Sequence, residues 1–331
     1  MRILSRLPPL AEFIVKRLLQ AIPTIFAILT LNFLMLHLAP GDPVMAIVGD
    51  ELTASAEWMD AMRAKLGLDR PLHVQFFEYI WDAVHGDLGF SLLKRAPVAE
   101  LVLERLANTL LLALTSMVLA VVIGIGLGLY ASKKPYSFRD NFFTFIAVIG
   151  LAVPIFWFGQ ILIQIFALTL KWLPVSGVQT IGAGYTGWTL IQDKILHFVM
   201  PVITLSMGSF AFLTRLTRST MLNVSSEDYI LTAKAKGLSE NAIMFKHAFR
   251  NALLPLTTSL TLRFGYIISG ALLTETVFSW PGIGRLTFDA LGTSDYPVIM
   301  GIFVITSVMV VLAVLLADIL YALIDPRIRY R

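Results

Sequence analysis

Long apolar runs alternate with polar stretches along the chain, and six of these runs reach the length of a membrane span. A helix needs about 20 mainly apolar residues to cross a bilayer. The runs that qualify are residues 13–38, 106–130, 141–170, 196–214, 252–274 and 298–324. The pattern predicts an all-α membrane protein with six transmembrane helices.

Four basic residues lie before or at the start of the first run, as they do at the apolar part of a signal peptide. It is too long for such a segment, and Pro40 occupies the place where cleavage would fall. We therefore interpret residues 13–38 as an uncleaved membrane anchor.

The lysines and arginines give the direction of the spans. With the N-terminus inside, 16 of the 26 basic residues fall in cytoplasmic segments and nine in outer segments. Basic residues are enriched in the cytoplasmic loops of membrane proteins. The distribution predicts that both termini are cytoplasmic.

The composition supports lipid as the solvent. The chain is 57% hydrophobic and 15% charged, whereas about 25% charged residues are usual in soluble domains. It contains no cysteine, which excludes disulfides and thiolate zinc sites. The net charge of +4 is accounted for by basic cytoplasmic loops, so no nucleic-acid partner is expected.

The polar segment 39–105 follows the first span and is too long for a turn. Residues 52–66 have helical spacing and end before Gly67, a suitable residue after a helix. A second amphipathic run covers 72–84, and a third begins at Pro97. The segment predicts a small helical extracytoplasmic part; a plain spacer is the alternative.

Small residues and prolines mark the spans themselves. Ala120, Gly124 and Gly128 recur every four residues, a spacing that lets helix backbones approach closely in lipid; a hinge is the alternative. Pro154 and Pro201 are expected to kink their helices.

Three charged residues fall in or at the end of the spans: Arg263, Glu275 and Asp318. An ion inside the bilayer costs a few kcal/mol, which makes such residues candidates for a translocation pathway or gate. An Arg263–Asp318 pair is geometrically plausible, and a purely structural pair is the alternative. Glu275 either lines an outer gate or faces water.

The sequence carries no enzyme motif. It has no HExxH, no G-x-S-x-G, no acidic cluster with metal spacing and no P-loop. The chain is therefore expected to be non-catalytic, and any energy from ATP must arrive through a partner.

Residues 225–255 form a polar elbow between two spans. Ser225 and Asp228 have the spacing of a capping box, and Gly237 permits the left-handed conformation that ends a helix. Ser239 begins a second helix whose predicted apolar stripe is Ala242, Phe245, Phe249 and Leu253. Such an amphipathic elbow fits a groove on a soluble protein or rests on lipid headgroups.

The elbow sequence YILTAKAKGLSENAIMFKHAFRNALLP resembles the coupling loop of inner-membrane permeases of ATP-binding-cassette (ABC) importers, in the oligopeptide/dipeptide (peptide/nickel) branch. The wider family carries Glu-Ala-Ala where this chain has Leu231, Thr232 and Ala233, so only Ala233 and Gly237 carry over directly. Further resemblances, in chain order, are APGDP (39–43), GLDRPL (67–72), GDLGFS (86–91), VPIFWFG (153–159), WLPVSG (172–177), ETVFSWPGIGRL (275–286) and IDPRIR (324–329).

The resemblance implies a type I ABC importer permease fold in a bacterial inner membrane. It implies four parts: residues 1–38, the extracytoplasmic segment 39–105, a five-helix core 106–324 with the coupling loop 215–251, and a tail 325–331. The implied contacts with the ATPase are Glu227, Asp228, Tyr229, Ala233, Lys234, Lys236, Gly237, Leu238 and Ser239.

The resemblance also implies the partners: a second homologous permease, two ATPase subunits that bind ATP and Mg, and a substrate-binding protein docked on 40–105 and 276–297. This chain itself would bind no cofactor. The implied cargo is a peptide or related solute, with nickel chelates, glutathione and antimicrobial peptides within the branch. A stand-alone channel or ion-coupled secondary carrier is the alternative, and a scaffold without transport is a third.

Overall fold

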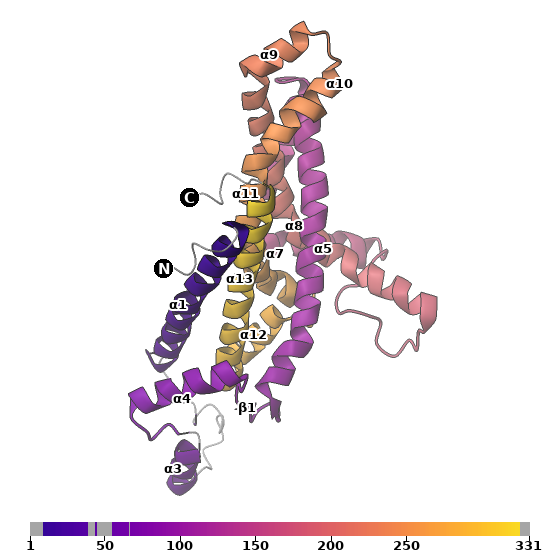
Figure 1. Ribbon diagram of the computed structural model, residues 1–331. Helices are drawn as coiled ribbons and strands as arrows, with labels where there is room; N and C mark the ends of the chain where they lie inside the picture. The colour runs from indigo at the N-terminus through magenta and orange to yellow at the C-terminus, as the bar shows by residue number, and fades with distance from the viewer. Residues whose placement is uncertain (1–8, 39–43, 45–54, 66, 325–331) are drawn as a thin grey trace. The chain divides into compact units, whose positions relative to one another are not determined.

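The computed structural model describes residues 9–38, 44, 55–65 and 67–324, and this part is mostly helical (Figure 1). The chain divides into two compact units. The first comprises Met1–Asn108 and Pro281–Leu315, and the second comprises Thr109–Trp280 and Leu316–Arg331. The long helices α5 and α13 each contribute residues to both units.

The first unit contains helices and one small hairpin. Strand β1 pairs antiparallel with β2, so that Ser91 lies opposite Ala96. The elements are α1 (Pro9–Leu38), α3 (Ala56–Lys65), α4 (Leu72–His85), β1 (Phe90–Ser91), β2 (Ala96–Pro97), the start of α5 (Val98–Ser132), α12 (Ile283–Gly292) and most of α13 (Tyr296–Ile324).

The core of the first unit joins α5, α12 and α13. A Cβ atom placed on Gly301 would lie 2.3 Å from a methyl carbon of Val98, so α13 approaches α5 closely at this point. The buried side chains that fill the core are Val98, Val102, Ile283, Leu286, Ala290, Val298, Ile299 and Ile302.

The helices predicted for residues 39–105 agree with the structure in two of three cases. α3 and α4 lie within or close to the predicted runs 52–66 and 72–84, and Gly67 has φ +68° after α3. The third predicted helix differs. Pro97 belongs to β2, and α5 begins at Val98 and continues without a break for 35 residues into the second predicted span.

The second unit is a helical bundle around α8, which packs against α6, α7 and α11. A little over a third of the way along, α8 continues through Pro201. The elements are the rest of α5, α6 (Phe138–Ala152), α7 (Ile155–Leu162), η2 (Ile163–Thr169), α8 (Gly187–Ser225), α9 (Asp228–Ala235), α10 (Glu240–Ala242), η3 (Ile243–Ala248), α11 (Phe249–Val277) and the end of α13.

Glycines on α5 allow it to touch α8. A Cβ on Gly124 would lie 2.7 Å from Leu213 Cβ, and one on Gly128 would lie 2.5 Å from Thr217 Cβ. Real Cβ atoms do not approach other atoms so closely, so only glycine fits at both positions. The predicted close approach of helix backbones is therefore confirmed.

The predicted third span, residues 141–170, is not one straight helix. α6 and the α7–η2 segment meet at 106°. Pro154 has no N–H to continue the hydrogen bonds of α6, and its ring favours the extended backbone seen at Val153, where ψ is 126°. The expected kink at Pro154 is a full break.

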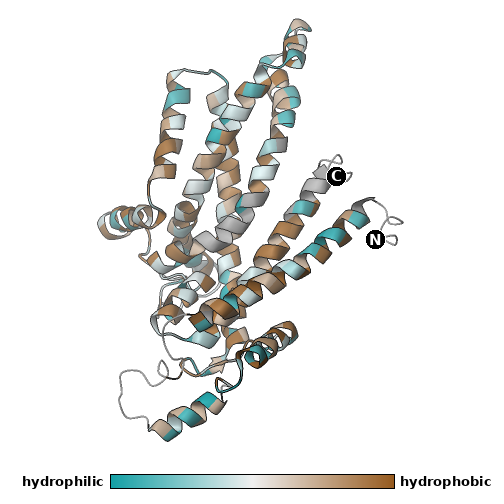
Figure 2. Ribbon diagram, turned by 90° about the vertical axis from the view of Figure 1, so that its left-hand side faces the viewer, coloured by the Kyte–Doolittle hydropathy of each residue, from teal (hydrophilic) through white to brown (hydrophobic). Residues whose placement is uncertain are grey.

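Four helices among the described residues are long and apolar enough to cross a membrane, or five if the bent pair counts as one span. Hydrophobic residues extend along most of their length in Figure 2, and many large ones on α1 and α5 are exposed in the single chain. The predicted span 252–274 runs through α11, where the side chains of 264–270 lie outside the described residues. Six spans remain a prediction.

Candidate functional site: the elbow between α8 and α11

The elbow consists of α9, α10 and η3 and lies at the upper end of the second unit in Figure 1. α9 ends at Ala235, and Gly237 lies in the turn that follows, with φ +74° and its N–H donating to Lys234 O at 2.9 Å. Ser239 caps the next helix by accepting from Ala242 N at 3.4 Å. The predicted glycine turn and the helix start at Ser239 are thus present, but the second helix is not short, because it continues through η3 into α11.

The predicted capping box is wrong. Ser225 is the last residue of α8, and its hydroxyl donates to Met221 O at 2.7 Å. Glu227 is the residue that precedes α9. Because α8 extends about three turns further than the apolar pattern indicates, the residue that precedes α9 lies two positions later than predicted.

Two buried side chains hold α9 on the bundle. Ile230 is 1% exposed and Ala233 is 5% exposed. They belong to one apolar cluster with Leu129, Met221, Ile243, Ala248 and Ala252. Ala233, one of the predicted contacts with the ATPase, therefore anchors the elbow from within and is not on its surface.

The predicted stripe of the second elbow helix is displaced. Phe245 is exposed, whereas Ile243, Ala248 and Ala252 are buried. Residues 243–248 form a π-helix, whose wider turn adds a residue and moves the buried face out of the 3.6-residue period. A periodicity argument that assumes an α-helix cannot locate this shift.

The other eight predicted coupling residues are exposed. Their surface combines charges, such as Asp228 and Lys234, with exposed apolar side chains that include Leu231, Leu238 and Phe245. Tyr229 is 40% exposed, and its hydroxyl accepts from Asn251 Nδ2 at 2.7 Å, which ties α9 to α11. Rigid backbone with an exposed mixed surface is suited to a protein contact.

An ion pair that the sequence did not reveal joins α6 to α8 below the elbow. Asp140 is fully buried, and both of its oxygens accept from the Arg218 guanidinium, Oδ2 at 2.7 Å. Oδ2 also accepts from Tyr136 N at 2.8 Å. The partners are 78 residues apart, so no local pattern signals them.

Arg263 lies on α11 and faces α8. Its guanidinium carbon is 3.8 Å from the centre of the Phe212 ring, and Nη1 donates to Ser209 Oγ at 3.4 Å. The predicted pair with Asp318 is not among its contacts with the part of the chain that the structure describes. Asp318 itself is partly buried on α13.

Glu275 is fully buried near the end of α11, so the interpretation that it faces water is wrong for this chain. Its Oε1 accepts from Thr109 Oγ1 at 2.7 Å, and its backbone carbonyl accepts from Trp280 N at 2.8 Å. The residue links α5 to the end of α11.

Long apolar helices and an exposed polar elbow define a multi-pass membrane protein. Residues 120–330 match the family described as binding-protein-dependent transport system inner membrane component, and residues 10–113 match the N-terminal part of such membrane components. The chain belongs to this family.

Curated relatives align over nearly the whole chain. The oligopeptide transport system permease protein AppB of Bacillus subtilis (strain 168) is 44% identical over 97% of this chain and 100% of its own. The glutathione transport system permease protein GsiC of Escherichia coli (strain K12) is 42% identical over 97% of this chain and 99% of its own.

A solved structure shares the fold. A chain of the MetNI methionine ABC transporter, in an inward-facing conformation, superposes with a TM-score of 0.53 at 17% identity, covering 68% of this chain and 96% of that one. About two thirds of the chain thus has the helical architecture expected of a type I importer permease.

Proposed function

We propose that the chain is the permease subunit of an ABC importer that takes up peptides from a substrate-binding protein. The observation that carries the proposal is the elbow, which is fixed to the bundle by Ile230 and Ala233 while eight predicted contact residues remain exposed. Family membership and relatives that carry oligopeptides and glutathione support it.

In this proposal the elbow receives force from two ATPase subunits, which hold ATP and Mg. α9 enters a groove on the ATPase, and its buried face transmits movement to α8 and α11 through the apolar cluster. Gly237 sets the angle between α9 and the following helix, since its φ of +74° is unfavourable for other L-residues.

The proposed topology has six spans with both termini in the cytoplasm of a bacterium, and a second, homologous permease subunit completes the pathway. The excess of Lys and Arg on the cytoplasmic segments supports this direction. Segment 39–105 then lies outside, where it contributes to docking of the substrate-binding protein.

We assign Arg263 to the pathway or its gating, with Glu275 and Asp318 as further candidates. A guanidinium in a span is costly, and the contacts of Arg263 with described residues include one hydrogen bond, to Ser209, and the face of the Phe212 ring. Arg263→Leu should reduce uptake at least tenfold while Arg263→Lys retains more activity. Full uptake by Arg263→Leu at equal protein amount would remove Arg263 from the pathway.

Purification of the tagged chain from native membranes tests the function. The proposal expects a P-loop ATPase and a second permease to copurify, and expects uptake to require ATP. A stand-alone channel or ion-coupled carrier, the alternative, would transport as the purified single chain without ATP. Transport by the chain alone would contradict the proposal.

A further inference from the structure

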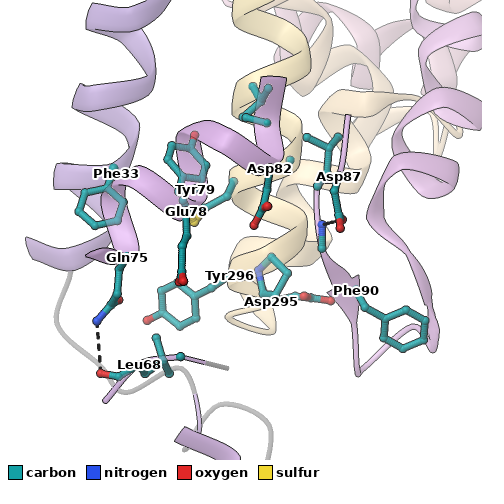
Figure 3. A pocket seen from close by; sticks show the side chains of 18 of the residues that line it. Phe33, Leu68, Gln75, Glu78, Tyr79, Asp82, Asp87, Phe90, Asp295 and Tyr296 are labelled. Carbon is teal, nitrogen blue, oxygen red and sulfur yellow. Dashed lines mark hydrogen bonds between the residues drawn. The ribbon is translucent and has the colours of Figure 1, made fainter. Parts of the chain in front are cut away.

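A cavity of about 610 Å³ lies within the first unit and is not used by the elbow or the bundle. Its wall combines the end of α1, α4, the loop after α3, β1 and the start of α13 (Figure 3). A volume of this size suits a small organic group or a long side chain.

Four carboxylates line the cavity, and they differ in the ion pairs and hydrogen bonds that they make. Glu78 pairs with Arg70, and Asp87 Oδ1 accepts from Gly89 N at 2.9 Å. Asp82 is exposed and points toward the cavity. The two basic side chains in the wall are engaged elsewhere: Arg63 pairs with Asp60, and His37 contacts Gln75.

Asp295 is the deepest of the four and is only 4% exposed. Its Oδ2 accepts from Ser91 Oγ at 2.5 Å, and a neutral hydroxyl does not compensate the charge of the carboxylate. A charge buried in this way is costly unless a cation arrives from outside. Asp295 therefore indicates a cationic or hydrogen-donating occupant.

Aromatic side chains complete the wall. Phe33, Tyr79, Phe90 and Tyr296 line the cavity. Burial raises the pKa of the Tyr79 phenol to about 12, so it stays neutral and adds no negative charge at physiological pH. Aromatic rings beside carboxylates are the surroundings that favour organic cations.

A metal ion fits the site less well than an organic cation does. Over the described ranges, no three His, Asp or Glu side chains gather in a group that could hold a metal ion. The four carboxylates instead lie around a space much larger than an ion, with apolar surface between them.

We propose that this cavity receives the guanidinium or ammonium head of an arginine or lysine side chain of the extracytoplasmic substrate-binding protein. The assignment rests on the proposed function, which places segment 39–105 outside. That segment carries eleven acidic and six basic residues, a field that attracts a basic partner surface and orients it before contact.

Binding of a small probe to the full chain in lipid nanodiscs tests the chemistry, with no ATPase present. Calorimetry should show that n-butylguanidinium binds and that the neutral isostere n-butylurea does not. Asp82→Asn should weaken binding about threefold, and Asp295→Asn at least tenfold. The Asp82 side chain has no hydrogen bond in the described structure to lose, so Asp82→Asn still tests the site even where Asp295→Asn folds poorly.

Glu100→Gln is the matched control, because Glu100 is an exposed carboxylate of the first unit outside the cavity. Equal binding of the two probes, or equal losses in Asp82→Asn and Glu100→Gln, would overturn the site. Because the chain is tested alone, this failure is distinct from a failure of the ATPase to copurify.

Docking of the cognate binding protein tests the source of the cation. Asp82→Asn should weaken docking, and raised salt should weaken docking to the unaltered chain more than to the variant. Unchanged docking combined with a selective loss of lysine- or arginine-containing cargo would overturn the assignment to the binding protein.

Discussion

Glycines are needed for different reasons in two regions: the contact between α5 and α8, which we call the seam, and the elbow. Gly124 and Gly128 are needed for space, since a Cβ at either position would collide with α8. Gly237 has nothing within 4 Å of a Cβ, and is needed for its φ of +74°. The first region depends on packing and the second on backbone geometry.

The difference separates stability from coupling. In the seam, backbone contact and the adjacent Asp140–Arg218 pair hold three helices together. In the elbow, a small apolar cluster fixes the position of α9 while its outer surface stays exposed. We expect substitutions in the bundle to lower the amount of folded protein, and substitutions in the elbow to lower transport at an unchanged amount.

The largest expected effect comes from Arg218→Leu. Removing the cation leaves Asp140 buried and charged, which costs about 3 kcal/mol for a buried pair. Thermal unfolding in detergent should show the loss. Arg215→Leu, an exposed arginine less than one turn away, is the control and should unfold like the unaltered chain. Equal stability of the two variants would show that the pair does not hold the bundle.

Gly128→Ala comes next. The added methyl group must displace α8 from α5, at a cost of about 1–3 kcal/mol for an overpacked interior. Gly126→Ala places its Cβ in open space on the same helix and should be neutral or slightly stabilising. If Gly128→Ala and Gly126→Ala unfold at the same temperature, α5 and α8 do not pack at Gly128 as closely as the structure indicates.

Tyr229→Phe should have the smallest effect. It removes the hydroxyl that accepts from Asn251, and an exposed hydrogen bond contributes about 0.5 kcal/mol. Hydrogen exchange at α9 should rise about twofold, with the unfolding temperature of the bundle unchanged. Tyr185→Phe, which removes another exposed tyrosine hydroxyl, should alter neither. A lower unfolding temperature of the bundle in Tyr229→Phe would show that the elbow and the bundle unfold as one cooperative unit.

Turns and helix ends that depend on a single residue could be predicted from the sequence, whereas contacts between residues far apart in the chain could not. The turn at Gly237 and the helix end at Gly67 follow from the conformational freedom of a single residue. Asp140 and Arg218 meet only because α6 and α8 pack, and Thr109 meets Glu275 for the same kind of reason.

Two errors arose from the assumption of regular helices. The π-helix at 243–248 shifted the apolar stripe, and the continuation of α8 to Ser225 moved the cap of α9. Neither a wide turn nor the length of a packed helix is encoded in hydrophobic spacing alone, because tertiary contacts decide both.

The number of peptides imported per ATP hydrolysed, compared between Gly237→Val and Gly237→Asn, tests the central claim. Valine should strain the left-handed turn by about 1–2 kcal/mol, whereas asparagine tolerates it. We predict that the valine variant keeps its protein amount and its ATPase activity but loses most uptake. The asparagine variant should keep both its ATPase activity and its uptake. An unchanged ratio in the valine variant would contradict the claim that the elbow couples ATP hydrolysis to transport.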